Sequence, residues 1–489
     1  MISYLRGSVK TGTPSFILYW ILSPFSMKKR EFVFGAMLLL SSLFLQCTLA
    51  QTRIAVLADT HVVGPGLVVS DGAAWQAELA ADRKMLDYSQ QIFDQLTDKL
   101  KADAPEVVLL PGDLTKDGER LSHEYVSSKL GELVAAGIKV YVTPGNHDLG
   151  TGRASVFDGD AKSPAETVDA SQFATLYASC GYGEGSEIHG LSYAVEPVEG
   201  LLLLSIDSHS GSVSADDLDW ACGKAEQAAK ECKQVLVMMH HPLMPHIYGA
   251  EIFVNTSTVG NYETVRNRLA DAGVRVVLTG HFHTSDIAKD WNADMTKEIY
   301  DINTGSTVSY PCDYRMLTLS ANRAQLSVTT GSVTSLEGVD DFGSVAKERL
   351  TKSMSAIATN MLQDKLGALA VMAGPLAAQA FVLHAEGDEN NSETAQTMLN
   401  TLGILAAQQF PDLNSTMQSA LSDISNYGTE RADQTPDRTL TIDLPVLTSG
   451  ISSLRQDSSH SDEFYTLQGV RTAKPVKGVN VKDGRLVVF

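Results

Sequence analysis

The sequence has few positive charges for its length. Its 489 residues include 38 Lys and Arg against 58 Asp and Glu, which gives a formal net charge of −20. A surface of that sign repels nucleic-acid backbones and anionic lipid at long range, so non-specific binding to either is disfavoured. A small anionic ligand is compatible with this composition where bound cations reverse the local sign.

Long apolar runs are few, and the one near the N-terminus is too short to cross a bilayer comfortably. Phe32–Leu45 follows the basic patch Lys28–Arg30 and precedes Thr48–Ala50, which offers small residues where a signal peptidase reads. This order predicts a signal segment over residues 1–50, maturation near Gln51 and no transmembrane segment in the mature chain. The expected location is the periplasm, the cell surface or the medium, with an uncleaved membrane anchor as the alternative.

Cysteines are also few, and their spacing excludes the common cysteine-based sites. None lies in a CxxC or zinc-ribbon pattern, so no metal role is predicted for them. Four follow the signal segment, and an exported protein could pair them in three ways. The stretch Ser214–Cys232 predicts a helix, which would hold Cys222 about 15 Å from Cys232 and excludes that pair. The four are Cys180, Cys222, Cys232 and Cys312.

Residues 51–332 alternate strand-like apolar runs with amphipathic helical segments. This alternation predicts a layered α/β domain. Three later segments, Glu298–Asn303, Arg315–Ser320 and Gln325–Thr330, follow one another without helices, which predicts antiparallel pairing and therefore mixed sheets. The predicted helices are Ala77–Lys101, Leu121–Ala136, Ser171–Ala178, Ser214–Lys230 and Tyr262–Ala272.

Residues 333–455 differ in composition from the domain before them. Ala, Leu, Met and Gln dominate Val345–His384 and Glu393–Phe410, which predicts a helical appendage. Two roles stay open for it: a cap over a site, with His384, Glu386 and Asp388 at a turn, or a stabilising side domain. Residues 456–489 are strand-like and resemble the C-terminal sorting tails of exported Bacteroidetes proteins, with a packed β-hairpin as the alternative.

Seven side chains able to bind metal fall in five short clusters, and four of the clusters directly follow apolar runs that predict buried strands. The carboxyl ends of strands are where α/β proteins place their chemistry, so a two-metal site is expected there. Mixed imidazole, carboxylate and amide ligands favour Zn, Mn or Fe, because Mg and Ca prefer oxygen alone. Two neighbouring cations repel and need a shared carboxylate, which we predict to be Asp113 because Gly112 lets the backbone turn tightly. The seven are Asp59, His61, Asp113, Asn146, His240, His281 and His283.

The order of these motifs resembles that of the calcineurin-like metallophosphoesterases, over most of Arg53–Gly331. It is most similar to their cyclic-nucleotide and glycerophosphodiester phosphodiesterase branch. The motifs are Asp59-x-His61, Gly112-Asp113, Gly145-Asn146-His147-Asp148, His240-His241-Pro242 and Gly280-His281-x-His283. The resemblance implies a layered α-β-β-α sandwich with mixed sheets. It also implies one metal on Asp59, His61, Asp113 and His283, and a second on Asp113, Asn146, His240 and His281.

The resemblance implies roles for residues beside the ligands as well. His147 would meet the leaving-group oxygen as hydrogen-bond donor or general acid. Asp148 would either orient His147 or only cap the following turn. Some family members carry an acidic residue three positions after the bridging Asp that pairs with this His; here that position is Lys116, and Asp117 comes one later. His240 takes the family's ligand position, which leaves His241 next to the site.

The function expected from the resemblance is hydrolysis of small phosphodiesters by a metal-bridging hydroxide, in an exported enzyme. A phosphomonoesterase of the acid-phosphatase kind is an alternative within enzymes. The other alternative is a catalytically silent surface-binding protein on the same scaffold. A site that has lost its catalytic role usually loses a metal ligand first, whereas this sequence has the full set of ligands. Tyr310, Asp313 and Arg315 offer groups for phosphate recognition, with structural packing as the alternative.

Overall fold

The computed structural model describes residues 50–246, 258–387, 397 and 436–446, and four short strands between 464 and 488. The chain divides into one unit of Met1–Leu49 and another of Ala50–Phe489. The signal segment falls in the first unit, outside the described residues, and stays a prediction. In the described part of the chain, no helix has both the length and the apolar composition to cross a bilayer.

One six-stranded mixed sheet carries the first half of the site. Three of its strands are parallel, because the chain returns through helices α4 (Ser89–Asp103) and α5 (Arg120–Ala135) between them. The other three are antiparallel and occupy the opposite edge. The order across the sheet is β16 (Thr439–Asp443), β15 (Gln325–Ser332), β14 (Asp313–Leu319), β1 (Thr52–Val56), β3 (Val107–Pro111) and β4 (Lys139–Thr143).

A seven-stranded mixed sheet carries the second half. Its four central strands are parallel, and its edge strands are antiparallel. Helices α7 (Ala215–Lys230) and α8 (Tyr262–Asp271) make the returns on either side of β10. The order is β12 (Asp286–Trp291), β13 (Glu298–Asn303), β11 (Val276–Thr279), β10 (Gln234–Met238), β9 (Leu201–Ser205), β8 (Ser192–Val198) and β7 (Glu187–His189).

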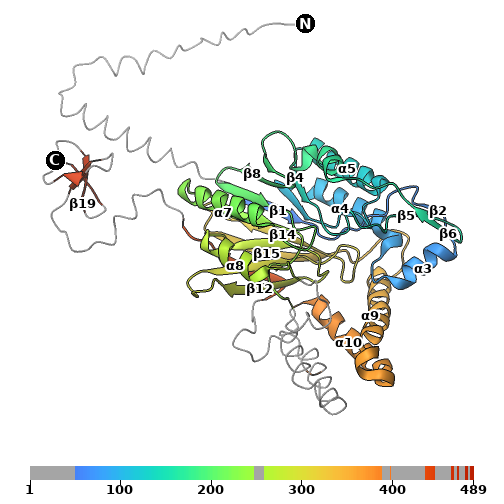
Figure 1. The fold of residues 1–489 in the computed structure, drawn as a ribbon. Coiled ribbons are helices and arrows are strands. Elements are labelled where there is room, and N and C mark those ends of the chain that lie inside the picture. Colours follow the sequence, from blue (N-terminus) through green and yellow to red (C-terminus); the bar gives the residue numbers. More distant parts are fainter. Residues whose placement is uncertain are drawn as a thin grey trace, which may run out of the picture. The chain divides into compact units, whose positions relative to one another are not determined.

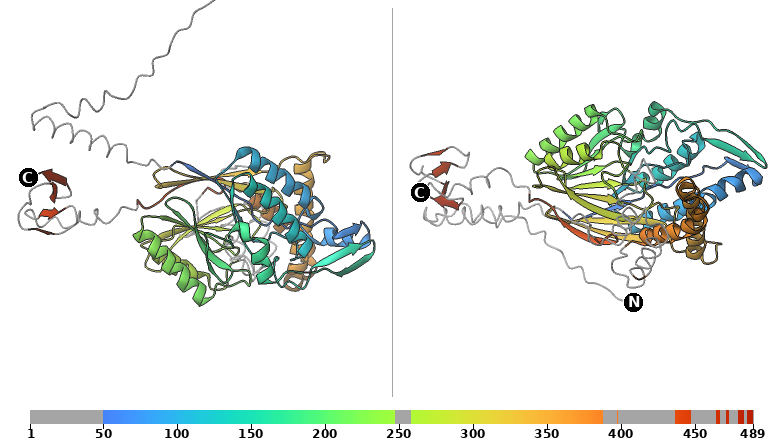
Figure 2. Two further views of the ribbon diagram at one scale, coloured as in Figure 1. Left: turned by 90° about the horizontal axis from the view of Figure 1, so that it is seen from above. Right: turned by 60° about the horizontal axis from the view of Figure 1, so that its bottom comes forward.

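The two sheets face each other between two helical layers, which confirms the predicted α-β-β-α sandwich (Figures 1 and 2). Alternation along β10 shows how the sequence produces this arrangement, because successive strand side chains point to opposite faces. Leu236 and Met238 join the large core that also contains Val108 of the other sheet. Val237, between them, packs instead with Leu218 of α7 and other residues beneath the outer helices.

One predicted helix is wrong in its extent. The segment Ala77–Lys101 forms two helices, α3 (Ala73–Ala81) and α4, separated by a turn and the short 3-10 helix η1 (Leu86–Tyr88). Long-range and local polar contacts override the helical pattern here: Met85 N donates to Val308 O at 2.6 Å, and Lys84 N donates to the Asp82 carboxylate at 3.0 Å. A small sheet of β2 (Val68–Ser70), β5 (Ser155–Asp158) and β6 (Ala161–Pro164) lies beside α3. The short helix α6 (Ala170–Leu176) follows.

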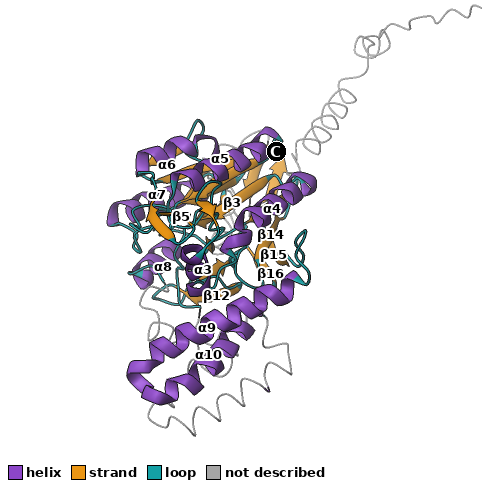
Figure 3. Cartoon of the chain, turned by 90° about the vertical axis from the view of Figure 1, so that its right-hand side faces the viewer, coloured by secondary structure: helices purple, strands orange, loops and turns teal. Residues whose placement is uncertain are grey.

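Within the predicted appendage the structure describes two long helices, α9 (Phe342–Leu366) and α10 (Ala370–Glu386), packed side by side (Figure 3). The segment Glu393–Phe410 lies outside the described residues except for residue 397, and so does Asp388. Residues 439–443 are β16, which pairs with β15, so this part of the range belongs to the first sheet. The boundaries of the appendage stay a prediction.

The C-terminal segment forms an antiparallel four-stranded sheet. Its order is β18 (Arg471–Thr472), β17 (Phe464–Thr466), β19 (Val479–Lys482) and β20 (Arg485–Val488). The strand-like pattern of this tail therefore corresponds to strands, whereas its role as a sorting signal stays a prediction.

Candidate metal centre

The predicted ligands come together from the ends of both sheets. Asp59 follows β1, Asp113 follows β3 and Asn146 follows β4 in one sheet, while His240 follows β10 and His281 follows β11 in the other. Because these strands run parallel within each sheet, their carboxyl ends meet at one edge. The convergence expected from the sequence is present in the structure for all seven ligands, as the distances below show.

The backbone at these strand ends is strained in order to aim the side chains. Five ligands are non-glycine residues with positive φ, a region that costs of order 1–3 kcal/mol per residue and often marks functional sites. They are Asp59, His61, Asp113, His281 and His283, at φ 51°, 39°, 50°, 72° and 66°. The neighbouring glycines permit close approach: a Cβ on Gly112 would lie 2.5 Å from His240 Nδ1, and one on Gly145 would lie 2.2 Å from Asp113 Oδ1.

The first ligand group is completely buried. His61 Nε2 lies 3.1 Å from His283 Nε2 and 3.7 Å from Asp113 Oδ2, and His283 Nε2 lies 3.4 Å from Asp59 Oδ1. One potential ligand atom from each of the four residues lies within 4.8 Å of the others. These are the four residues predicted to hold one metal.

The second group shares Asp113 with the first. His240 Nε2 lies 3.4 Å from Asp113 Oδ2 and 3.0 Å from Asn146 Oδ1, and His281 Nδ1 lies 2.9 Å from the same amide oxygen. The Nδ1 of His240 is 2.9 Å from the carbonyl of Pro111, which can only accept, so Nδ1 carries the hydrogen and Nε2 presents its lone pair to the site. Asp113 Oδ2 therefore faces both groups, as a bridging carboxylate must.

His241 lies with the second group too. Its ring centroid is 4.3 Å from that of His281, and a ligand atom of each lies within 4.8 Å of one on His240. Burial, together with His281 and His240, lowers the pKa of His241 to about 2, so it is neutral. The backbone amides of His240 and His241 both donate to Ser208 Oγ, which positions this pair of residues.

The chemistry of this donor set fits metal cations. In the described residues, the ion-pair partners of Asp59 and Asp113 within 4.0 Å are histidines alone. Burial raises the pKa of Asp59 to about 8, with His240 opposing and the Asp113 charge reinforcing the rise. Burial and nearby Lys84 hold the pKa of His61 well below its usual value, so it is a neutral ligand. Burial opposes the effect, but Asp113 raises the pKa of His240 to about 9, so without a metal this imidazole carries the positive charge that faces both carboxylates. A bound cation would displace its Nε2 proton and stabilise the same carboxylates.

Among the described residues, buried histidine nitrogens without hydrogen-bond partners are also compatible with a bound ligand at this site. The Nδ1 atoms of His61, His241 and His283 are buried and have no hydrogen-bond partner. Since buried polar atoms are nearly always satisfied, such a concentration at one place marks a site for a ligand or for bound water.

His147 lies at the open edge of the site, with its side chain 18% exposed and its ring 4.7 Å from that of His61. Its Nδ1 is 2.6 Å from the carbonyl of Lys116 and 3.0 Å from Asp117 Oδ1. The carbonyl accepts, so Nδ1 carries hydrogen and Nε2 is left to face a ligand. Asp117 is thus the carboxylate that orients His147, a role that sequence reasoning left undecided because the residue is displaced by one position.

Asp148 was predicted to be a catalytic residue, but its side chain contacts backbone amides instead. Its carboxylate is buried and accepts hydrogen bonds from the amides of Leu114, Thr115 and Gly145, at 3.1, 3.0 and 2.8 Å. It therefore ties together the turns that carry Asp113 and Asn146, which differs from both predicted roles, orienting His147 and capping the turn that follows Asp148. Burial raises the pKa of Asp148, with His123 opposing it.

The residues considered for phosphate recognition are engaged in packing. Arg315 is buried and donates to the carbonyl of Asn303 at 2.8 Å, and Asp313 pairs with Arg438 at 2.9 Å. Tyr310 donates to Glu386 at the end of α10 at 2.7 Å. These contacts join β14 to β13 and to Arg438, and Tyr310 to the helical pair, so the packing alternative is the one that the structure supports.

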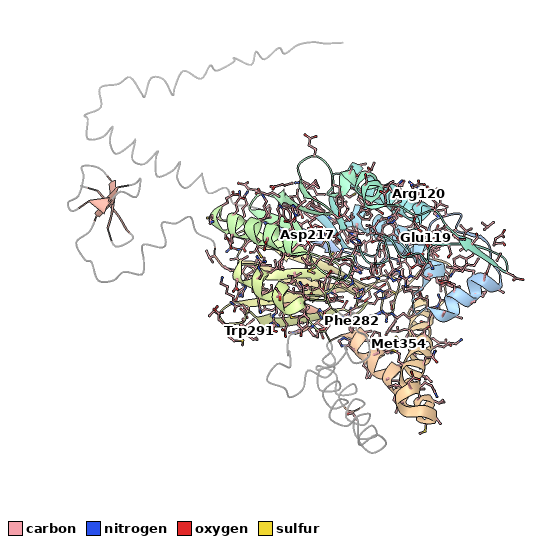
Figure 4. The ribbon with its side chains drawn as sticks, in the orientation of Figure 1. Glu119, Arg120, Asp217, Phe282, Trp291 and Met354 are labelled. Atoms are coloured by element: carbon pink, nitrogen blue, oxygen red, sulfur yellow. The ribbon has the colours of Figure 1, made fainter. Side chains whose placement is uncertain are left out.

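Helix α10 reaches the loop that carries two of the ligands. Phe282, between His281 and His283, has its ring 6.3 Å from that of Phe381 and 6.0 Å from that of His384. Phe282 and Met354 of α9 lie on the side where the helical pair joins the sandwich (Figure 4). Contact with the ligand loop is compatible with either role for the appendage, which stays a prediction.

Comparison with known proteins shows which family this part of the chain resembles. Residues 52–285 match the family described as calcineurin-like phosphoesterase. A Synechococcus protein named as a probable cyclic nucleotide phosphodiesterase is 25% identical over 193 residues, covering 38% of this chain and 62% of its own. A Fibrobacter succinogenes protein with a similar name is 23% identical over 181 residues, covering 37% and 58%. The chain thus spans about three fifths of the length of these relatives.

Solved structures also resemble this chain. A dimetal phosphatase from Danio rerio matches with 13% identity and a TM-score of 0.41, covering 57% of this chain and 95% of its own. A purple acid phosphatase from yellow lupin matches with 10% identity and a TM-score of 0.33, covering 58% and 52%.

Proposed function

Because residues 52–285 form a calcineurin-like phosphoesterase domain, we propose that the protein is a dinuclear-metal phosphodiesterase that acts on small phosphoesters. The observation that carries the proposal is the position of Asp113 Oδ2, 3.7 Å from His61 Nε2 and 3.4 Å from His240 Nε2. One carboxylate oxygen facing two ligand groups is what a two-cation centre requires. The names of the two curated relatives favour diesters.

The metals we propose are two divalent or trivalent transition ions, Zn, Mn or Fe, because the donors mix imidazole with carboxylate and amide oxygen. Two such cations about 3.5–4 Å apart would supply a hydroxide nucleophile at neutral pH and neutralise charge on the phosphoryl oxygens. Asp59, His61, Asp113 and His283 would hold one, and Asp113, Asn146, His240 and His281 the other. His241 would complete the surroundings of the second.

His147 completes the reaction at the leaving group. As the oxygen of the hydroxide nucleophile bonds to phosphorus, the bond from phosphorus to the ester oxygen breaks, and that oxygen takes a proton from His147 Nε2. Asp117 holds the imidazole with Nδ1–H directed away from the substrate, and it stabilises the protonated ring. The partial exposure of His147 places this step where an ester group can extend into solvent.

The test is turnover by the full chain loaded with Zn, Mn or Fe, on a chromogenic bis-ester and on its mono-ester. We expect the bis-ester to be the better substrate by kcat/KM. Turnover of the mono-ester alone would make the protein a phosphomonoesterase. Two bound metals without turnover of either would favour the silent binding protein.

We also propose that the protein is exported, on the basis of Lys28–Arg30, Phe32–Leu45 and the small residues Thr48–Ala50. Sequencing the N-terminus of the protein from its native cell should find a start near Gln51 in the periplasmic, surface or secreted fraction. Membrane-bound protein that keeps Phe32–Leu45 would instead indicate an uncleaved anchor.

A further inference from the structure

Arg153, which no motif singled out, lies directly beside His147. Its Nε is 3.1 Å from Asp117 Oδ1, and its Nη2 is 3.4 Å from His147 Nε2 and 3.2 Å from His147 Nδ1. The loop that carries it is held to the site, because Thr151 Oγ1 donates to the carbonyl of Asp117 and accepts from the amide of Arg153. The arginine side chain is 55% exposed, so its terminal nitrogens are accessible from solvent at the open edge.

Asp117 Oδ1 accepts from Nε of Arg153 and from Nδ1 of His147, so the inner donors of both side chains are held by one carboxylate. Nδ1 of His147 already directs its hydrogen to the carbonyl of Lys116, so it cannot accept from the guanidinium. Nη2 of Arg153 lies 3.4 Å from His147 Nε2, the atom that the proposed function places at the leaving group. A phosphoryl oxygen bound there would accept a charge-assisted hydrogen bond from the guanidinium.

The charges around Arg153 also favour an anion. Asp117 Oδ2 is 2.5 Å from the buried Lys116 Nζ, so its charge is already matched before Arg153 is counted. Glu78 pairs with Lys116 and with Lys162, each at 2.8 Å. Buried Glu119 also lies near Lys116. Asp117 itself faces two cations, Lys116 and Arg153, so there is an excess of positive charge at this carboxylate, and of the two cations the guanidinium is the exposed one. This excess occurs in a chain of net charge −20.

We propose that Arg153 is a substrate-binding residue, whose Nη2 donates to a phosphoryl oxygen next to the leaving group that His147 protonates. The inference rests on the proposed phosphoesterase function and adds a binding contact to it. A planar guanidinium held by Asp117 through Nε keeps its terminal donors free for the phosphoester anion.

The experiment compares R153A and R153K with the wild type in the metal-loaded full chain. We expect R153A to raise KM for the bis-ester about tenfold to a hundredfold, the usual effect of losing one charge-assisted hydrogen bond. The dissociation constant for inorganic phosphate, measured by calorimetry without any turnover, should rise by a similar factor. The KM and the phosphate dissociation constant of R153K should lie between those of the wild type and R153A, because an ammonium supplies charge without the planar guanidinium donors.

The matched control is R268A on α8, since Arg268 is also an exposed arginine, 41% exposed and paired at 2.6 Å with Asp219 of α7, in the outer helices. It should leave KM and phosphate affinity unchanged. Wild-type protein that hydrolyses no phosphoester would overturn the proposed function, whatever Arg153 does. An active wild type whose R153A variant has unaltered KM and phosphate affinity, or loses only kcat, would overturn the assignment of Arg153.

Discussion

At the scale of single residues, the properties of the site depend on which partners each of three carboxylates contacts. Asp113 faces both histidine groups, Asp117 orients His147, and Asp148 accepts backbone amides. These three carboxylates come from neighbouring turns, yet each has a different function because its contacts differ. Substitutions at this scale should therefore separate metal binding from proton transfer.

Asp113→Asn should abolish turnover and reduce bound metal, because an amide oxygen carries no charge to hold two cations together. Metal analysis of purified protein should show fewer than about two ions per chain. Asp217→Asn on α7 is the control, since this carboxylate accepts hydrogen bonds from the hydroxyls of Ser192 and Ser214 on the outer side of the second sheet. Full metal content in Asp113→Asn would contradict the bridging role.

His147→Ala should lower kcat by about a hundredfold to ten-thousandfold while both metals are retained, because a general acid is lost and no ligand is removed. Measuring kcat and metal content on the same preparation tests the assignment. Asp117→Asn should give a smaller loss with the metals also retained. Loss of a metal ion from His147→Ala would make this residue a ligand rather than a proton donor.

At the scale of elements, the loop after β10 is held by a buried charge triad. His246 Nδ1 lies 3.0 Å from Asp286 Oδ2 of β12, and His246 Nε2 lies 3.2 Å from Asp301 Oδ2 of β13. Asp301 also accepts from the amides of Leu243 and Met244. One protonated imidazole thus connects the loop that begins at His240 to two strands of the second sheet.

This triad should make stability depend on pH. Burial opposes the effect, but Asp301 and Asp286 raise the pKa of His246 from 6.5 to about 10. A raised pKa means that the stabilisation is fully present below pH 6.5 and is lost as pH rises through about 10. Thermal unfolding midpoints should therefore fall between pH 6.5 and 10. Burial opposes the shift, but His246 lowers the pKa of Asp286 below its usual value, so Asp286 is ionised at these pH values.

His246→Gln is the variant that checks this origin. It should lower the free energy of unfolding at pH 6.5 by about 3 kcal/mol, since two buried carboxylates lose their cation, and should flatten the pH dependence. His189→Gln, on a half-buried ring stacked against Trp220, should change neither quantity. An equal slope in His246→Gln and wild type would assign the pH dependence to other groups.

At the scale of the whole molecule, the two sheets are joined at one edge by the ligands. Asp59, Asp113 and Asn146 come from one sheet and His240, His281 and His283 from the other, so bound cations would connect both halves. Burial, reinforced by the charge of Asp113, raises the pKa of Asp59, so these carboxylates are costly to keep ionised when no metal is bound. Metal binding and folding stability should therefore be linked.

Removing metal with a chelator should lower the unfolding midpoint of the wild type, and adding Zn or Mn should restore it. At a free metal concentration a hundred times the dissociation constant, each site adds about 2.7 kcal/mol. Differential scanning calorimetry of the chelated and reloaded protein measures the shift. Asp113→Asn should show a much smaller one, whereas identical midpoints for chelated and reloaded wild type would refute the linkage.

Much of this organisation was predictable from local sequence. Strand and helix periodicity predicted the layered fold, because alternation and 3.6-residue repeats are local consequences of which face is buried. The seven ligands were recognisable for a similar reason: each stands within a few residues of the end of an apolar run, and strand ends share an edge. The boundaries of Ala77–Lys101 were not predictable, because the contact of Met85 with Val308 is made over more than 200 residues.

What the sequence by itself determined is therefore the set of candidate ligands that converge and the layers that carry them. Tertiary structure alone decided that Asp117 and not Asp148 orients His147, that Arg153 lies beside that ring, and that Thr439–Asp443 returns to pair with β15. The physical reason is that a residue type specifies which bonds a side chain is able to make. Which of those bonds form depends on segments that only folding brings within about 3 Å of one another.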